Sequence, residues 1–163
     1  MQTNNLGKGY RLGRTPIAEV FDCYVGAVGC YGVYVLRDEV VVLDHSKKIR
    51  AGKLPTVMEI NTYFCRRNGV KYRVMNYTKT DSRYQGAGIA HHIYALVAEK
   101  TGPIMSGSSQ SPGARSLWNR LAATRFVAAL WKGEVYPVEY SEYSEVDCAE
   151  FEVYENASRL VAV

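Results

Sequence analysis

Apolar residues of the kinds that favour β-strands are concentrated in the first part of the chain. Residues 19–28 (EVFDCYVGAV) and 30–46 (CYGVYVLRDEVVVLDHS) are rich in Val, Tyr and Cys. The second stretch predicts a hairpin that turns near Arg37 and Asp38. This part of the chain therefore reads as β-structure.

The clearest turn signal follows at Asn68-Gly69, between the β-rich residues 56–67 and 70–80. An Asn-Gly pair in this position is typical of a two-residue type I′ turn. Such a turn pairs Arg67 with Val70 and fixes the register of the whole hairpin. Carried along the strands, this register places Glu59 opposite Thr78.

The apolar period changes from two to about 3.6 residues after residue 86. One helical face over residues 86–100 collects Ile89, Ile93, Leu96 and Val97, and Thr101-Gly102-Pro103 ends the helix. A short strand (PIMSG, 103–107) follows, and Ser111-Pro112 begins a second helix, which Ala114, Leu117 and Leu121 line on one side. The remaining predicted strands are 125–131, 134–140 and 151–155.

Strands, a helix, a strand, a helix and further strands in this order indicate the α/β or α+β class. The expected architecture is a mixed sheet with helices against its faces. With 163 residues and neither internal repeat nor long linker, residues 1–163 are expected to form one domain.

The charge is unevenly distributed. Residues 133–155 carry eight acidic residues and no Lys or Arg, whereas residues 1–132 carry nineteen basic and eight acidic residues. No stretch is apolar enough for a signal peptide or a membrane span, so we expect a cytoplasmic protein without a membrane partner. The four cysteines lack metal-ligand spacing, so no metal is expected.

Glycines crowd the start of the first predicted helix, in YQGAGIAHHI (84–93). A bare helix N-terminus favours an anion, because its backbone N–H groups are unpaired and its dipole end is positive. A tight, closely packed connection is the alternative reason for small residues. The dinucleotide fingerprint does not fit, because His91 stands where its third glycine belongs.

The segment Gln85-Gly86-Ala87-Gly88-Ile89-Ala90 fits the Arg/Gln-x-x-Gly-x-Gly/Ala signature of acyl-CoA binding, and here the chain resembles the GNAT-superfamily N-acetyltransferases. The resemblance extends over roughly residues 55–132, with the strand-helix-strand-helix order of that family. It implies a GNAT-like, mostly antiparallel central sheet flanked by helices, with acetyl-CoA as co-substrate. It also implies pyrophosphate binding at Gln85, Gly86, Ala87, Gly88, Ile89 and Ala90, and pairing of the pantetheine arm with the backbone of Thr78, Lys79 and Thr80.

Catalytic candidates come from the resemblance and from the hairpin register. Trp118 stands where the family often has a tyrosine that protonates the leaving thiolate, and an indole N–H cannot do this. Tyr84 is a substitute donor, unless the thiolate leaves unassisted or the chain does not catalyse. Glu59 is the candidate general base, with an ordinary solvent-facing glutamate as the alternative. Asp81 either acts as a base or holds the turn.

The sequence therefore predicts an N-acetyltransferase that transfers an acetyl group from acetyl-CoA to an amine, on a protein or a small molecule, by direct attack. The alternative is a catalytically impaired GNAT-like scaffold that binds a protein as inhibitor or adaptor. Nucleic acid is the weakest class of partner, because no basic helix or RNA-binding signature is present. The oligomeric state stays open, with a homodimer among the options.

Overall fold

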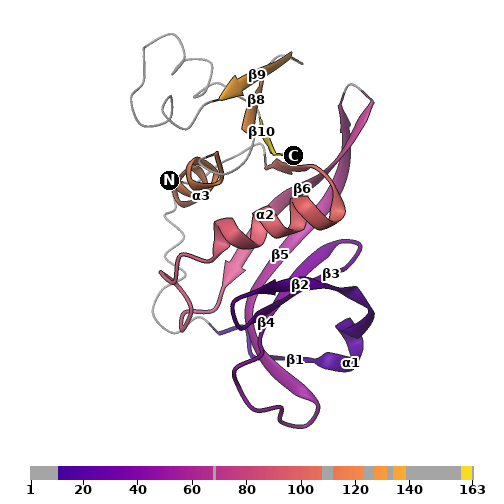
Figure 1. Cartoon of the computed structure of the whole chain (residues 1–163), viewed down its shortest axis with the longest axis vertical. Coiled ribbons are helices and arrows are strands. Elements are labelled where there is room, and N and C mark those ends of the chain that lie inside the picture. Colours follow the sequence, from indigo (N-terminus) through magenta and orange to yellow (C-terminus); the bar gives the residue numbers. More distant parts are fainter. Residues whose placement is uncertain are drawn as a thin grey trace. The chain divides into compact units, whose positions relative to one another are not determined.

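The computed structural model describes residues 11–67, 69–107, 112–122, 127–131, 134–138 and 159–162. These residues fall into two compact units (Figure 1). The first unit holds the chain up to Tyr63 together with Asn76–Ile89, and the second holds Phe64–Met75 and the chain from Ala90 onward. The two long strands β5 (Lys53–Arg67) and β6 (Val70–Thr80) contribute residues to both units.

The first unit is an antiparallel sheet with the strand order β2-β3-β4-β5-β6, and β1 pairs with β5 beside it. Figure 1 shows its first strands curling beside α1. The hairpin expected near Arg37 and Asp38 is confirmed, since the strands on either side of these residues pair antiparallel. The elements before β5 are β1 (Arg14–Pro16), α1 (Ile17–Val20), the 3-10 turn η1 (Phe21–Cys23), β2 (Tyr24–Val28), β3 (Tyr31–Val35) and β4 (Glu39–Asp44).

One apolar cluster joins α1 to the curled sheet. Val20 of α1 packs with Tyr34, Val41, Leu43 and Leu54, all buried. The expected strand over 19–28 is therefore wrong in its first half. Residues 17–23 instead form α1 and η1, because the short helical turn directs Val20 into this cluster. Strand structure starts only at Tyr24.

Gly32 of β3 lies directly under the imidazole of His45. A Cβ at Gly32 would clash with Nε2 of His45, and this nitrogen is 2.8 Å from the hydroxyl of buried Tyr34. We expect Gly32→Ala to displace the imidazole and break this hydrogen bond, which costs about 1 kcal/mol of unfolding free energy. Urea denaturation of Gly32→Ala measures the loss, and Gly29→Ala, in open space at a left-handed turn, separates the steric effect from backbone strain.

In the second unit the strands are ordered β6-β7-β10-β8-β9. β7 (Ile104–Ser106) is parallel to β6, and the remaining neighbours are antiparallel. The strand pair expected over 125–131 and 134–140 is confirmed, and β10 was not predicted. The expected strand at 151–155 lies outside the described residues. The last three strands are β8 (Val127–Trp131), β9 (Glu134–Val138) and β10 (Arg159–Ala162).

Two helices pack together in the second unit, α2 (Ala90–Thr101) and α3 (Pro112–Ala122). The rings of Tyr94 and Trp118 meet edge to face with 6.0 Å between centroids, and Trp118 is only 2% exposed. Trp118 therefore belongs to the packed interior of this unit. The predicted start of the first helix is wrong, since residues 86–89 precede α2 in an exposed turn.

The chain thus has a mixed α+β fold with a mostly antiparallel, curled sheet and few helices. Among the helices that the structure describes, none is both long enough and apolar enough for a membrane span.

Candidate functional site

A change of register in the β5–β6 hairpin determines which side chains meet in the first unit. The amide of Asn76 donates to the side-chain oxygen of Asn61 at 3.2 Å, which agrees with the register that the Asn-Gly turn predicts. Further along, the N–H of Asp81 donates to the carbonyl of Val57 at 2.9 Å, which is shifted by one residue. Between these two contacts β6 therefore contains one residue more than β5, which is a β-bulge.

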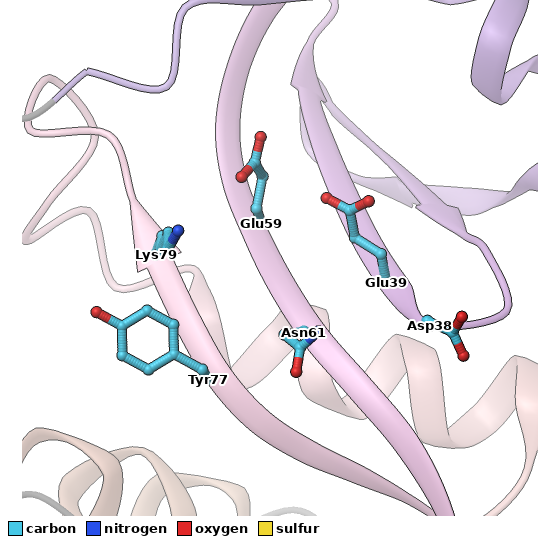
Figure 2. Close-up of a pocket in the computed structure, with 6 residues that line it drawn as sticks. All are labelled: Asp38, Glu39, Glu59, Asn61, Tyr77 and Lys79. Atoms are coloured by element: carbon cyan, nitrogen blue, oxygen red, sulfur yellow. The ribbon is translucent and has the colours of Figure 1, made fainter.

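The bulge changes the expected partner of Glu59. Tyr77 and Lys79 line a pocket together with Glu59 (Figure 2). Because side chains alternate along a strand, Thr78 faces away from this pocket. The expected pairing of Glu59 with Thr78 is therefore wrong by one residue, and the neighbour of Glu59 across the strands is Lys79.

The pocket has a volume of about 340 Å³ and is acidic. Figure 2 shows that its side chains come from the start of β4, the middle of β5 and the end of β6. Three carboxylates and one ammonium give the lining a formal charge of −2. Such a site attracts a cation of the size of an alkylamine. The lining residues are Asp38, Glu39, Glu59, Asn61, Tyr77 and Lys79.

Glu39 is the carboxylate of this pocket with an altered acidity. It pairs with Asn61 in the β4–β5 ladder. Burial raises its pKa above the ordinary value, the charge of Glu59 raises it further, and Lys79 partly offsets both effects. A carboxylate with a raised pKa is a better general base near neutral pH than an ordinary one.

The turn that follows β6 is held by the carboxylate of Asp81, which is fully buried. The backbone N–H groups of Leu12 and Arg83 donate to it at 2.9 and 3.0 Å. The guanidinium of Arg83 donates through Nε at 2.9 Å and Nη2 at 3.1 Å. Burial alone would raise the pKa of Asp81, but these hydrogen bonds and the charge of Arg83 hold it well below its usual range. Of the two roles considered for Asp81, these contacts support the one of holding the turn.

A second carboxylate anchors the same turn through Tyr84. The hydroxyl of Tyr84 donates to Oδ2 of Asp44 at 2.7 Å, and its ring meets that of Tyr31 edge to face. Burial and the hydrogen bond to Asp44 raise the pKa of Tyr84 far above its ordinary value. Burial would also raise the pKa of Asp44, but hydrogen bonds from Ser46 and Tyr84 outweigh it and lower that pKa. Tyr84 therefore stays protonated, and its O–H group is engaged in the hydrogen bond to Asp44.

The glycines of the turn serve its backbone conformation. Gly86 and Gly88 have φ angles of 79° and 70°, in the left-handed region that favours glycine. Within the described residues, no group accepts a hydrogen bond from the N–H of Gly86, Gly88 or Ile89. Gln85, Gly86, Ala87 and Gly88 are exposed and Ile89 is half-buried, so the N–H groups of Gly86 and Gly88 belong to an exposed segment.

The structure thus brings together some of the predicted site residues. Glu59 and Lys79 line one pocket, and the Gln85 side chain donates to the carbonyl of Thr80, linking the turn to the strand end. Tyr84 does not line that pocket. Sequence reasoning missed Glu39, whose only local signal was an acidic pair in front of a buried strand.

Comparisons of the chain with protein-family models, curated proteins and solved structures gave no match. In the described part of the chain, no three or more His, Cys, Asp or Glu side chains are grouped so as to hold a metal ion. Any assignment of activity therefore depends on the geometry above and on the resemblance in residues 84–90.

Proposed function

We propose that this protein is an acyl-CoA-dependent N-acetyltransferase that acts on a cationic amine. The proposal rests mainly on the end of β6 in the first unit. This end contributes Lys79 to the acidic pocket, and the chain continues directly into the exposed turn. We therefore assign the amine site and the anion site to consecutive segments of the chain.

The turn fits the pyrophosphate of acetyl-CoA in charge and in exposure. The N–H groups of Gly86, Gly88 and Ile89 have no acceptor among the described residues, and Asp81 and Asp44 anchor the turn through hydrogen bonds. We assign Gln85–Ala90 to the pyrophosphate and Thr78, Lys79 and Thr80 to the pantetheine arm. When bound, acetyl-CoA supplies an activated thioester.

The pocket would bind and deprotonate the acceptor. An alkylamine is protonated at neutral pH, with a pKa of about 10.4, and must lose a proton before it can attack. The carboxylates of Glu59 and Asp38 attract the ammonium, and Glu39 accepts the proton because its pKa is raised toward neutrality. The acidic lining favours a cationic amine as the acceptor, on a small molecule or on a lysine side chain.

A scaffold without turnover is the second candidate, and two contacts favour it. Trp118 is packed against Tyr94, and the hydroxyl of Tyr84 is donated to Asp44, so neither serves as a ready proton donor for the leaving thiolate. Such a scaffold would work by binding a protein. Thiol release in the presence of an amine separates it from the enzyme.

Calorimetric titration with acetyl-CoA tests the proposed function. We expect the native protein to bind, and Gly88→Glu to bind at least about tenfold more weakly, because the added carboxylate repels the negatively charged pyrophosphate beside the backbone N–H groups. Gly52→Glu is the matched control, since Gly52 has a φ of 73° in open space and lies outside the turn. A folded native protein that does not bind acetyl-CoA would contradict the proposal.

A further inference from the structure

The segment 45–53, which leads from β4 into β5 and is called the basic loop below, concentrates positive charge in the first unit. Every residue of this loop is exposed, and Figure 1 shows the loop extending past β1. The loop contains four lysine or arginine residues and no acidic residue, the four cations being Lys47, Lys48, Arg50 and Lys53.

The charges of the basic loop are largely uncompensated. Within the part of the chain that the structure describes, no carboxylate forms an ion pair with any of its four cations. Asp44, which precedes the loop, offsets part of the charge of Lys47. Its carboxylate is buried, however, and accepts hydrogen bonds from Ser46 and Tyr84. The cations further along the loop therefore have no acid to neutralise them.

Backbone contacts keep two of these cations side by side. Arg50 and Lys53 exchange both backbone hydrogen bonds at 3.0 Å, so their side chains stand directly opposite each other. Ala51 and Gly52 connect them with φ angles of 51° and 73°, as a type I′ turn requires. The guanidinium of Arg14 donates to the carbonyl of Lys53 at 3.1 Å and fixes the turn from β1. Like charges in this position destabilise a sheet, and a local rule broken in this way is expected at a functional surface.

An aliphatic side chain lies among these cations. Ile49, between Lys48 and Arg50, is 61% exposed. A single exposed aliphatic residue is common in proteins, so its surroundings decide its meaning. Apolar side chains flanked by lysine and arginine are typical of segments that lie at the surface of an anionic bilayer, where the cations meet headgroups and the apolar groups enter the acyl boundary.

We propose that the basic loop binds the surface of an anionic phospholipid bilayer. Lys48, Arg50 and Lys53 contact the headgroups, and Ile49 enters the boundary of the acyl chains. The loop has no Phe, Tyr or Trp on which a base could stack, so single-stranded nucleic acid would match the charges but leave Ile49 in water. An acidic protein would need a pocket of its own for Ile49, whereas a bilayer accepts it anywhere.

The proposal departs from the expectation that the protein has no membrane partner. That expectation was based on the lack of an apolar span, which binding at the bilayer surface does not require. The proposal does not depend on acetyl transfer.

Co-sedimentation of the full chain with vesicles tests the basic loop. We expect binding at low salt to phosphatidylcholine vesicles that contain about one-third phosphatidylserine, release at about 500 mM salt, and no binding to phosphatidylcholine alone. Arg50→Gln combined with Lys53→Gln should weaken binding about 25-fold, since each cation near the surface contributes about fivefold. The unfolding temperature of this variant should stay equal or rise, because a like-charge pair is removed, and this result excludes misfolding as the cause.

Lys71→Gln combined with Lys100→Gln is the matched control. Both lysines are exposed and lie outside the basic loop, so the variant loses the same charge and should bind vesicles like the native protein. Absence of native binding at low salt, or an equal loss of binding in this control, would overturn the proposal.

Ile49→Ser separates a bilayer from the other anionic partners. We expect it to bind the anionic vesicles at least about fivefold more weakly, since the apolar contribution is lost while every charge remains. Ile49→Leu should bind like the native protein. Unchanged vesicle binding of Ile49→Ser would overturn the insertion of this side chain. Tighter binding of the native protein to a labelled oligothymidine than to the vesicles would instead assign the basic loop to nucleic acid.

Discussion

Asp81→Asn is expected to lower the free energy of unfolding by about 3 kcal/mol, since it removes several hydrogen bonds to a buried charge. The carboxylate accepts from the N–H groups of Leu12 and Arg83 and from the guanidinium of Arg83. An asparagine keeps one acceptor oxygen but turns an NH₂ group toward these donors. Urea denaturation measures the loss, and Asp22→Asn, on an exposed part of η1, should leave stability nearly unchanged.

The pH dependence of this loss follows from the lowered pKa of Asp81. A carboxylate whose pKa is lower in the folded state than in the unfolded state stabilises the fold at any pH above the unfolded-state pKa. For an ordinary aspartate this pKa is 3.8. The stabilisation is lost as the pH falls from 3.8 toward the folded value. The difference in stability between the native protein and Asp81→Asn should therefore be full near neutrality and narrow below about pH 4. A difference that stays constant down to acid pH would mean that the carboxylate charge is not what stabilises the turn.

Local signals in the sequence predicted the hairpins and the presence of α2 and α3. The Asn-Gly pair determines the register of the hairpin tip, and the contact between Phe64 and Arg73 agrees with it. Proline at position 112 begins α3 because its fixed φ suits the first helical turn. In each case the deciding residues are neighbours in the chain, so the sequence alone was enough.

Other features depend on residues that are distant in the chain. Val20 turns into the interior because Leu54 and Leu43 lie there, and a strand pattern over 19–28 cannot reveal this. The bulge between Asn76 and Asp81 adds one residue to β6, and no composition signal marks it. It moves Lys79 to the position across from Glu59.

Part of the candidate site could be predicted from local signals, and part depends on residues that are distant in the chain. Glu59 and the glycine turn follow from the hairpin signal and the resemblance to a known signature. Glu39 enters only through the pairing of β4 with β5, which places it opposite Asn61. That pairing joins residues about twenty positions apart and is fixed by burial of the Val40–Leu43 run, so its register could not be derived from a turn.

Glu39→Gln is expected to lower kcat of amine acetylation by about 10²–10⁴-fold, the usual contribution of a general base. The reason is that Glu39 lies in the acidic pocket and burial raises its pKa. Thiol release with acetyl-CoA and an alkyl diamine measures the rate. Glu19→Gln, an exposed glutamate of α1, should retain the native rate.

The pH–rate profile then assigns the separate roles of Glu39 and Glu59. Burial raises the pKa of Glu39 most, and the charge of Glu59 adds to this. If Glu39 is the base, Glu59→Gln removes that charge and moves the acidic limb of kcat to lower pH, while the loss of an attractive carboxylate raises KM. If Glu59 is the base, the same variant instead abolishes the limb and most of the rate. An acidic limb unchanged in both variants would place the base outside this pocket.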